Sequence, residues 1–179
     1  MAAIEKDNSV TMVSDSLTTL GSGTVVPPMR EKITVIGDWL VGTAGFLDYC
    51  QFYIRGLEAE YRGGNEDLSD PFLHRKIQES FALVSKLPGG EGLDDNAVHM
   101  LLARHGEVWK VTQMEIPHQV PWAAVGCGDR IAYHFMNKGC KGKWLPKLLE
   151  IGAEVASSDV FVGGPFFSAD TNTLKVVRH

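Results

Sequence analysis

The stretch from Val10 to Gly45, VTMVSDSLTTLGSGTVVPPMREKITVIGDWLVGTAG, constrains the fold more than any other part of the chain. A strand-like run ends at Asp15, and a turn region rich in glycine and proline follows from Gly21 to Pro28. Two further short β-like runs flank a Gly-Asp pair, whose leading glycine suits a type II′ hairpin. These runs are Lys32 to Ile36 and Trp39 to Thr43. The stretch predicts a strand, a turn region and a hairpin before any helix begins.

Amphipathic helices then follow in two pairs. Apolar residues recur at helical spacing from Phe46 to Tyr61, and the pattern repeats from Asp70-Pro71 to Leu87. Asp70 as a cap with proline at the first helical position is a good start signal. The second pair is predicted over Asp129 to Asn137 and from about Trp144 to Ala156. Two consecutive amphipathic helices fit one outer layer of a sandwich.

Short β-like runs precede, separate and follow these helix pairs. They are Ala2 to Glu5, Ala97 to Arg104, Val108 to Thr112, Trp122 to Val125, Val160 to Val162, and a closing hairpin of Phe166 to Ala169 with Thr173 to Val177. The order of strands, two helices, strands, two helices and strands disfavours a parallel βαβ sheet. It predicts an α+β fold: a four-layer αββα sandwich of two antiparallel sheets flanked by helices. With 179 residues, the chain is expected to form one domain over residues 1–179.

Composition narrows the class of protein. The formal net charge is -5, with acidic and basic residues mixed along the chain, which argues against nucleic acid as the main partner. The apolar runs are too short to span a bilayer, so we expect no membrane partner, and no signal peptide opens the chain. Three cysteines without metal spacing indicate a reducing, cytosol-like compartment. The six histidines lack ligand spacing as well, so no metal site or cofactor is expected.

Several short motifs occur in an order and at a spacing that resemble the proteasome β-subunit/HslV family of N-terminal nucleophile (Ntn) hydrolases. The resemblance covers nearly the whole chain, from Ala2 to about Val162. Its markers are Ser14-Asp15-Ser16, Lys32, Thr43-Ala44-Gly45, Gly126-Cys127-Gly128 and Asp159. The resemblance implies the αββα sandwich inferred above from the order of elements.

The resemblance also implies a site. In that family an N-terminal threonine attacks, its own α-amine acts as base, and a lysine held by an aspartate lowers the pKa of its hydroxyl. Carried over, the aspartate is Asp15 and the lysine is Lys32. Cys127 replaces a supporting serine, and Asp159 maps onto the aspartate that orients the amine. The expected substrate cleft is lined by two glycines, Gly45 and Gly126.

The position implied for the nucleophile lies about two residues ahead of Met1. No Thr, Ser or Cys stands at the front of the chain, and removal of Met1 leaves Ala2. We therefore expect Asp15, Lys32, Cys127 and Asp159 to be supporting or vestigial.

Taken alone, Asp15 could be a turn residue and Lys32 a solvated strand-edge charge. A Cys127 thiol nucleophile with His134 as base is disfavoured, because a buried structural cysteine is commoner. Asp94-Asp95 is expected to be a loop and cap, in preference to a paired-carboxylate site.

Three functions follow from the resemblance. The first is a non-catalytic, architectural subunit of a hexameric or heptameric homo-oligomeric ring, in the cytoplasm or as a component of a larger particle such as a virion. The second is an active HslV-type threonine endopeptidase, fed by an ATPase partner, if the true or processed N-terminus carries a threonine just before Met1. The third is an amidase that acts on a small substrate.

Overall fold

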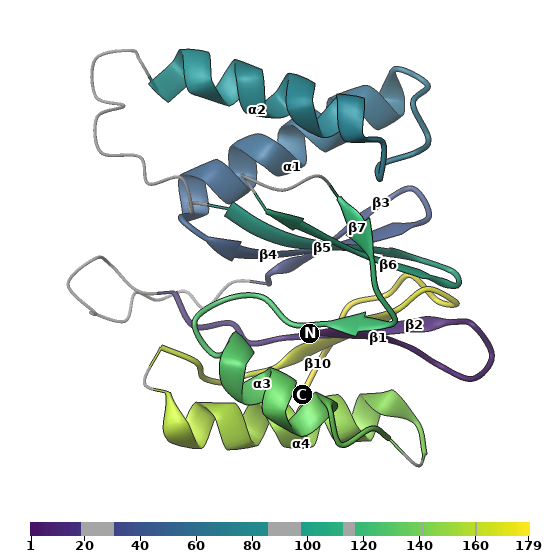
Figure 1. Cartoon of the computed structure of the whole chain (residues 1–179), viewed down its shortest axis with the longest axis vertical. Coiled ribbons are helices and arrows are strands. Elements are labelled where there is room, and N and C mark those ends of the chain that lie inside the picture. Colours follow the sequence, from purple (N-terminus) through teal and green to yellow (C-terminus); the bar gives the residue numbers. More distant parts are fainter. Residues whose placement is uncertain (19–30, 86–97, 113–116, 141, 160) are drawn as a thin grey trace.

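Two antiparallel sheets pack face to face at the centre of the molecule, and a pair of helices covers the outer face of each (Figure 1). This description rests on a computed structural model and covers residues 1–18, 31–85, 98–112, 117–140, 142–159 and 161–179. Within these ranges each sheet has five strands and all strand pairs are antiparallel. The predicted αββα sandwich is therefore confirmed.

The first sheet joins the two ends of the chain. Its strand order is β10-β9-β2-β1-β8, which places the N-terminal strand β1 between β2 and β8. The strands are β1 (Ala2–Ile4), β2 (Val10–Ser14), β8 (Trp122–Ala123), β9 (Phe167–Asp170) and β10 (Val177–Arg178). The residues ahead of β1 therefore enter the interior of the sheet and not its edge.

The second sheet is built from one continuous part of the chain, in the order β3-β4-β5-β6-β7. Its strands are β3 (Ile33–Ile36), β4 (Trp39–Gly45), β5 (Val98–Arg104), β6 (Glu107–Thr112) and β7 (His118–Gln119). Ile36 pairs with Trp39 across a two-residue turn in which Gly37 has φ +60°. A positive φ at the first turn residue alone is that of the expected type II′ hairpin.

The helices form the two outer layers. They are α1 (Leu47–Arg62), α2 (Pro71–Ser85), α3 (Asp129–Met136) and α4 (Trp144–Ser158). The pair α1 and α2 lies over the second sheet, and α3 and α4 lie over the first (Figure 1). Asp70 caps α2 as expected, because its carboxylate accepts a hydrogen bond from the Phe72 N–H at 2.9 Å. No helix of the described residues is long and apolar enough to cross a membrane.

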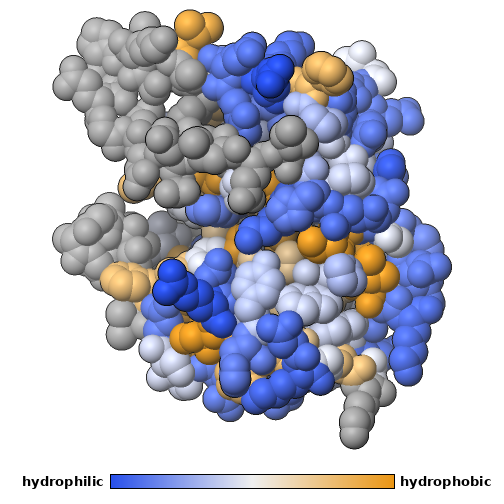
Figure 2. Space-filling view, in the orientation of Figure 1, coloured by the Kyte–Doolittle hydropathy of each residue, from blue (hydrophilic) through white to orange (hydrophobic). Residues whose placement is uncertain are grey.

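Three apolar clusters fill the spaces between the four layers. Met12 and Leu40 belong to the cluster between the sheets, Trp39 and Leu57 to the one under α1 and α2, and Val13 to the one under α3 and α4. Successive residues of β2 thus enter opposite cores, which explains why this strand is apolar on both faces. On the outside, Figure 2 shows hydrophilic residues over most of one face, with apolar side chains in small patches.

Some of the sequence predictions are wrong in detail. Phe46 does not belong to the buried stripe of α1, because it precedes the helix and is 56% exposed. Phe161 lies in a turn and Val162 outside any strand, so the strand predicted over Val160 to Val162 is wrong at these two residues, and Val160 lies outside the described residues. The closing hairpin exists, but its second strand is Val177–Arg178 instead of Thr173 to Val177. The predictions for Gly21 to Pro28 and for Asp94-Asp95 lie outside the described residues.

Replacement of Gly128 by alanine is expected to lower the free energy of unfolding by about 1–3 kcal/mol, the usual cost of overpacking a core. A Cβ at Gly128 would lie 2.3 Å from Val155 Cγ1 and 3.1 Å from Val162 Cγ2, and Val155 is buried in α4. Chemical denaturation measures the change. Gly142→Ala is the matched control, because nothing described lies within 4 Å of its Cβ position. Equal stability of both variants would contradict the close packing of Gly128 on α4.

Candidate functional site

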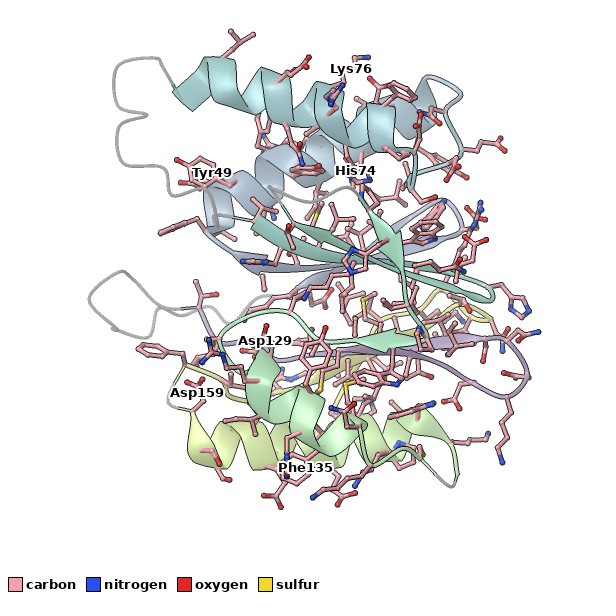
Figure 3. All side chains as sticks on the ribbon, viewed as in Figure 1. Tyr49, His74, Lys76, Asp129, Phe135 and Asp159 are labelled. Atoms are coloured by element: carbon pink, nitrogen blue, oxygen red, sulfur yellow. The ribbon has the colours of Figure 1, made fainter. Side chains whose placement is uncertain are left out.

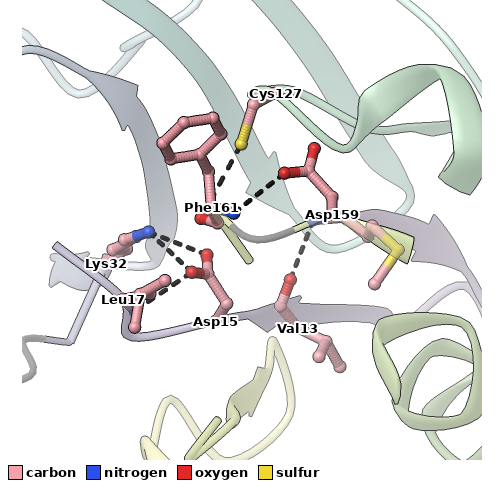
Figure 4. Close-up of polar contacts among 8 residues, drawn as sticks. Val13, Asp15, Leu17, Lys32, Cys127, Asp159 and Phe161 are labelled. Carbon is pink, nitrogen blue, oxygen red and sulfur yellow. Dashed lines mark hydrogen bonds and ion pairs between the residues drawn. The ribbon is translucent and has the colours of Figure 1, made fainter. Parts of the chain in front are cut away.

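An ion pair joins the two sheets at the end of β2. Asp15 follows β2 in the first sheet, and Lys32 precedes β3 in the second. Lys32 Nζ lies 2.8 Å from Asp15 Oδ1 and 2.9 Å from Oδ2, and both side chains are largely buried (Figure 4). Asp15 Oδ2 also accepts a hydrogen bond from the Leu17 N–H at 3.0 Å. Asp15 is therefore a turn residue and an ion-pair partner at once, and Lys32 is not a solvated edge charge.

The start of the chain lies beside this pair. The α-amine of Met1 donates a hydrogen bond to the Val13 carbonyl at 2.8 Å, and the Val13 N–H donates to the Met1 carbonyl at 2.8 Å. Burial lowers the pKa of this amine to about 5, although the Asp15 carboxylate acts in the opposite direction. The amine is therefore mainly neutral at pH 7. It occupies the ladder position that a peptide N–H would occupy in a longer strand.

The register of the sheet defines what faces Asp15. Ala2 pairs with Met12, and each step forward along β2 is one step back along β1. Asp15 is three residues beyond Met12, so its partner position in an extended β1 lies two residues ahead of Met1. This is the position that the family resemblance implies for the nucleophile.

Cys127 and Asp159 approach the same place from the helix layer. Cys127 lies in the turn between β8 and α3, and its Sγ is 3.8 Å from the Phe161 carbonyl (Figure 4). The preference for a buried structural cysteine is wrong here, because Cys127 is exposed. Partial burial of its sulfur, with Asp159 and Asp15 nearby, raises the pKa of the thiol. Asp159 follows α4, and its Oδ1 accepts a hydrogen bond from the Phe161 N–H at 2.8 Å.

Three cavities adjoin one another at these groups. One of about 90 Å³ lies beside Met1, Asp15 and Lys32 and reaches Cys127 and Asp129. A second of about 440 Å³ is lined by Ala44, Gly45, His99, Gly126, Cys127, Asp129 and Phe161. A third of about 160 Å³ extends from Gly45 to Cys50 and Ile54 on α1. The two glycines predicted for a cleft therefore border cavities: Gly126 the first two, and Gly45 the last two.

The structure brings four predicted residues to one region: Asp15, Lys32, Cys127 and Asp159. Their catalytic roles stay a prediction. His134 is exposed and contacts Phe135 edge-on, and it lines neither cavity that Cys127 borders.

Sequence reasoning missed two residues that border these cavities, Asp129 and His99. Asp129 directly follows the Gly126-Cys127-Gly128 marker, so its position beside that marker was a usable signal. Nothing in the local sequence marks His99, because it reaches the site only through its pairing with Ala44. No cluster of potential metal ligands occurs among the described residues.

No family model matches the sequence, and a search of curated proteins gives no match. Solved structures match over most of their length. The Thiobacillus denitrificans BPH in complex with epoxomicin has a TM-score of 0.69 and 17% identity, covering 94% of this chain and 96% of its own. Eukaryotic HslV from Trypanosoma brucei has a TM-score of 0.67 and 17% identity, covering 94% and 97%. The chain therefore has the Ntn-hydrolase fold of HslV and the proteasome β-subunits.

Proposed function

We propose that this chain is a subunit of an HslV-type homo-oligomeric ring, and that a polypeptide beginning at Met1 assembles without hydrolysing peptides. The observation that supports this most is the position of the Met1 amine. It lies beside the Asp15–Lys32 pair, where an N-terminal nucleophile would need its base, yet its residue carries a thioether side chain. The ring would be hexameric or heptameric, in the cytoplasm or in a larger particle.

The other nucleophilic side chains around the first cavity do not supply what is missing. Ser14, Thr43 and Cys127 border this cavity, but each stands inside the chain and has no free α-amine to act as its base. The hydroxyl of Ser14 has no hydrogen-bond partner among the described residues. The thiol of Cys127 is held protonated by burial and by two carboxylates, so it is a poor nucleophile at pH 7.

A polypeptide beginning at Met1 is expected to form a closed ring and to give no adduct with an electrophile directed at N-terminal threonine. Native mass measurement gives the number of subunits, and intact mass after labelling detects the adduct. N-terminal sequencing of the same sample establishes the residue at its front. A monomer in the native spectrum would count against the ring. An adduct on a chain whose first residue is Met1 would refute the proposal that the chain is non-catalytic. It would not contradict the proposal that the chain forms a ring.

A second candidate is favoured by the retained ion pair and by the free space beside it. Asp15 and Lys32 keep the close contact that an attacking hydroxyl needs, and the position opposite Asp15 in an extended β1 adjoins the first cavity. A polypeptide with a threonine two residues ahead of Met1 would place its hydroxyl and amine there. Such a chain would be an HslV-type threonine peptidase, and an ATPase partner would then be expected to deliver its substrates. This second candidate uses the same site as the first, with the added threonine as its nucleophile.

A further inference from the structure

Helix α2 lies in an outer layer of the molecule, and its outward face carries two exposed apolar side chains (Figure 1). Phe72 is 78% exposed and Leu83 is 67% exposed, so they are the two most exposed large apolar side chains among the described residues. They are eleven residues apart, which is about three helical turns, so both point to the same side of the helix. His74 and Ile77 point to the opposite side and are buried. The apolar pair therefore lies on the side of α2 that faces away from the core.

Charged residues occupy the middle of the stripe between these two apolar side chains. Lys76 and Glu79 complete a spacing of four, three and four residues, which is typical of a seam along which two helices pack. Arg75 lies beside this seam, and all three side chains are exposed, as Figure 3 shows for Lys76. Lys76 forms an ion pair with Glu60 of α1, whereas Arg75 and Glu79 have no ion pair with any described residue. The stripe therefore has apolar ends and a centre with charges of both signs.

The order of these groups makes the stripe complementary to itself. A two-fold axis through its centre places each residue opposite the one that is equally far from the axis on a second copy of α2. Phe72 then faces Leu83 of the second copy, and Glu79 faces Lys76 of the second copy, with Arg75 one residue further along. In a parallel pair Glu79 would instead face Glu79, which places like charges opposite each other. The stripe therefore matches a second copy in the antiparallel orientation only.

We propose that α2 is a contact surface between two copies of this chain, which pack these helices antiparallel across a two-fold axis. The apolar side chains at both ends of the stripe leave water, and each Glu79 carboxylate lies against the cationic side chains of the facing helix. No residue of α2 lines any of the three cavities beside the Asp15–Lys32 pair. The contact is therefore independent of the candidate site, and it requires neither hydrolysis nor a ring.

Sedimentation velocity at micromolar protein concentration measures the mass of the particle that each variant forms. We expect the parent chain to form a particle of about twice the mass of the Glu79→Lys particle, because this substitution makes every charge of the stripe positive. Leu83→Ser should halve the mass as well, because it removes the apolar contact at both ends of the helix pair. Glu154→Lys is the matched control, since it makes the same change of charge on the exposed outer face of α4 and should leave the mass unchanged.

A second experiment mixes two variants with opposite charges on the stripe. The Glu79→Lys chain carries only cations there, and the Arg75→Glu/Lys76→Glu chain carries only anions, so neither should pair with itself and the mixture should restore the doubled particle. Equal masses for the parent and Glu79→Lys chains, or a mixture whose components stay separate, overturn the proposal.

Thermal unfolding of each variant shows whether it is folded, and Glu79→Arg replaces a Glu79→Lys chain that is not. The mass of the Glu79→Lys particle tests the proposed ring separately. If that particle is a single chain while the parent chain forms a pair, the ring is refuted and the α2 contact is supported. If both chains form single rings of equal mass, the α2 contact is refuted and the ring is supported.

Discussion

A threonine exposed as the first residue of a Thr-Thr dipeptide placed directly before Met1 is expected to convert this chain into a peptidase. The first threonine then stands two residues ahead of Met1, opposite Asp15 in the β1–β2 ladder. Its hydroxyl comes beside Lys32, and its free amine can act as the general base. We expect hydrolysis of a fluorogenic peptide to rise at least about 1,000-fold over the chain that begins at Met1, because nucleophile and base contribute factors of this size.

The variant is produced behind a removable leader, so that the threonine amine is free after processing. Two controls separate chemistry from structure. An Ala-Thr dipeptide at the same place extends β1 equally and should give no activity. Lys32→Ala in the Thr-Thr chain should abolish most of the gain, because nothing then lowers the pKa of the hydroxyl. Activity that survives Lys32→Ala would mean that the Asp15–Lys32 pair has a structural role only.

Replacement of His74 by alanine is expected to lower the free energy of unfolding by about 3 kcal/mol, from a lost core side chain and the loss of its two ring hydrogen bonds. His74 belongs to α2 and is 1% exposed, and its side chain points toward α1 (Figure 3). Its Nε2 is 2.7 Å from the Leu68 carbonyl, and its Nδ1 is 2.8 Å from the Tyr53 hydroxyl. A carbonyl only accepts, so Nε2 carries the proton and Nδ1 accepts from Tyr53. Denaturant titration measures the loss, and His134→Ala on the exposed face of α3 is the control.

The same histidine should make the protein sensitive to acid. Burial lowers the pKa of His74, although Asp67 and Asp70 act against this shift. The unfolded chain therefore binds a proton at higher pH than the folded chain does. Stability is complete above the unfolded pKa of about 6.5 and falls toward lower pH by up to about 1.4 kcal/mol per pH unit. His74→Gln should flatten this dependence, and an unchanged slope would show that His74 titrates normally in the folded state.

Much of the fold could be predicted because its elements have local signals. The period of apolar residues located α1 and α2, Asp70-Pro71 located the start of α2, and a leading glycine specified the turn of the β3–β4 hairpin. The Asp15–Lys32 contact was predicted from the resemblance to the proteasome β-subunit/HslV family, because taken alone Asp15 could be a turn residue and Lys32 a solvated strand-edge charge.

The features of the fold and site that could not be predicted depend on which distant segments of the chain come into contact. The periodicity of apolar residues carries no information about such contacts. Cys127 was expected to be buried because a cysteine is usually apolar core, but it stands in a turn at the mouth of two cavities. The buried bond between His74 and Tyr53 was missed because each residue alone has an ordinary helical position. Phe161 and Val162 have strand composition, yet Asp159 accepts a hydrogen bond from the Phe161 N–H, and Phe161 lies in a turn instead.

The order of strands in the two sheets has a consequence for synthesis on the ribosome. Residues 33–119 contain every strand of the second sheet, so that sheet can pair while later residues are still being added. The first sheet cannot be completed then, since β2 needs β9 and β1 needs β8. Strands β1 and β2 can pair with each other early and β8 follows soon after, but the other edge of β2 stays without its partner until residues 167–170 have been made.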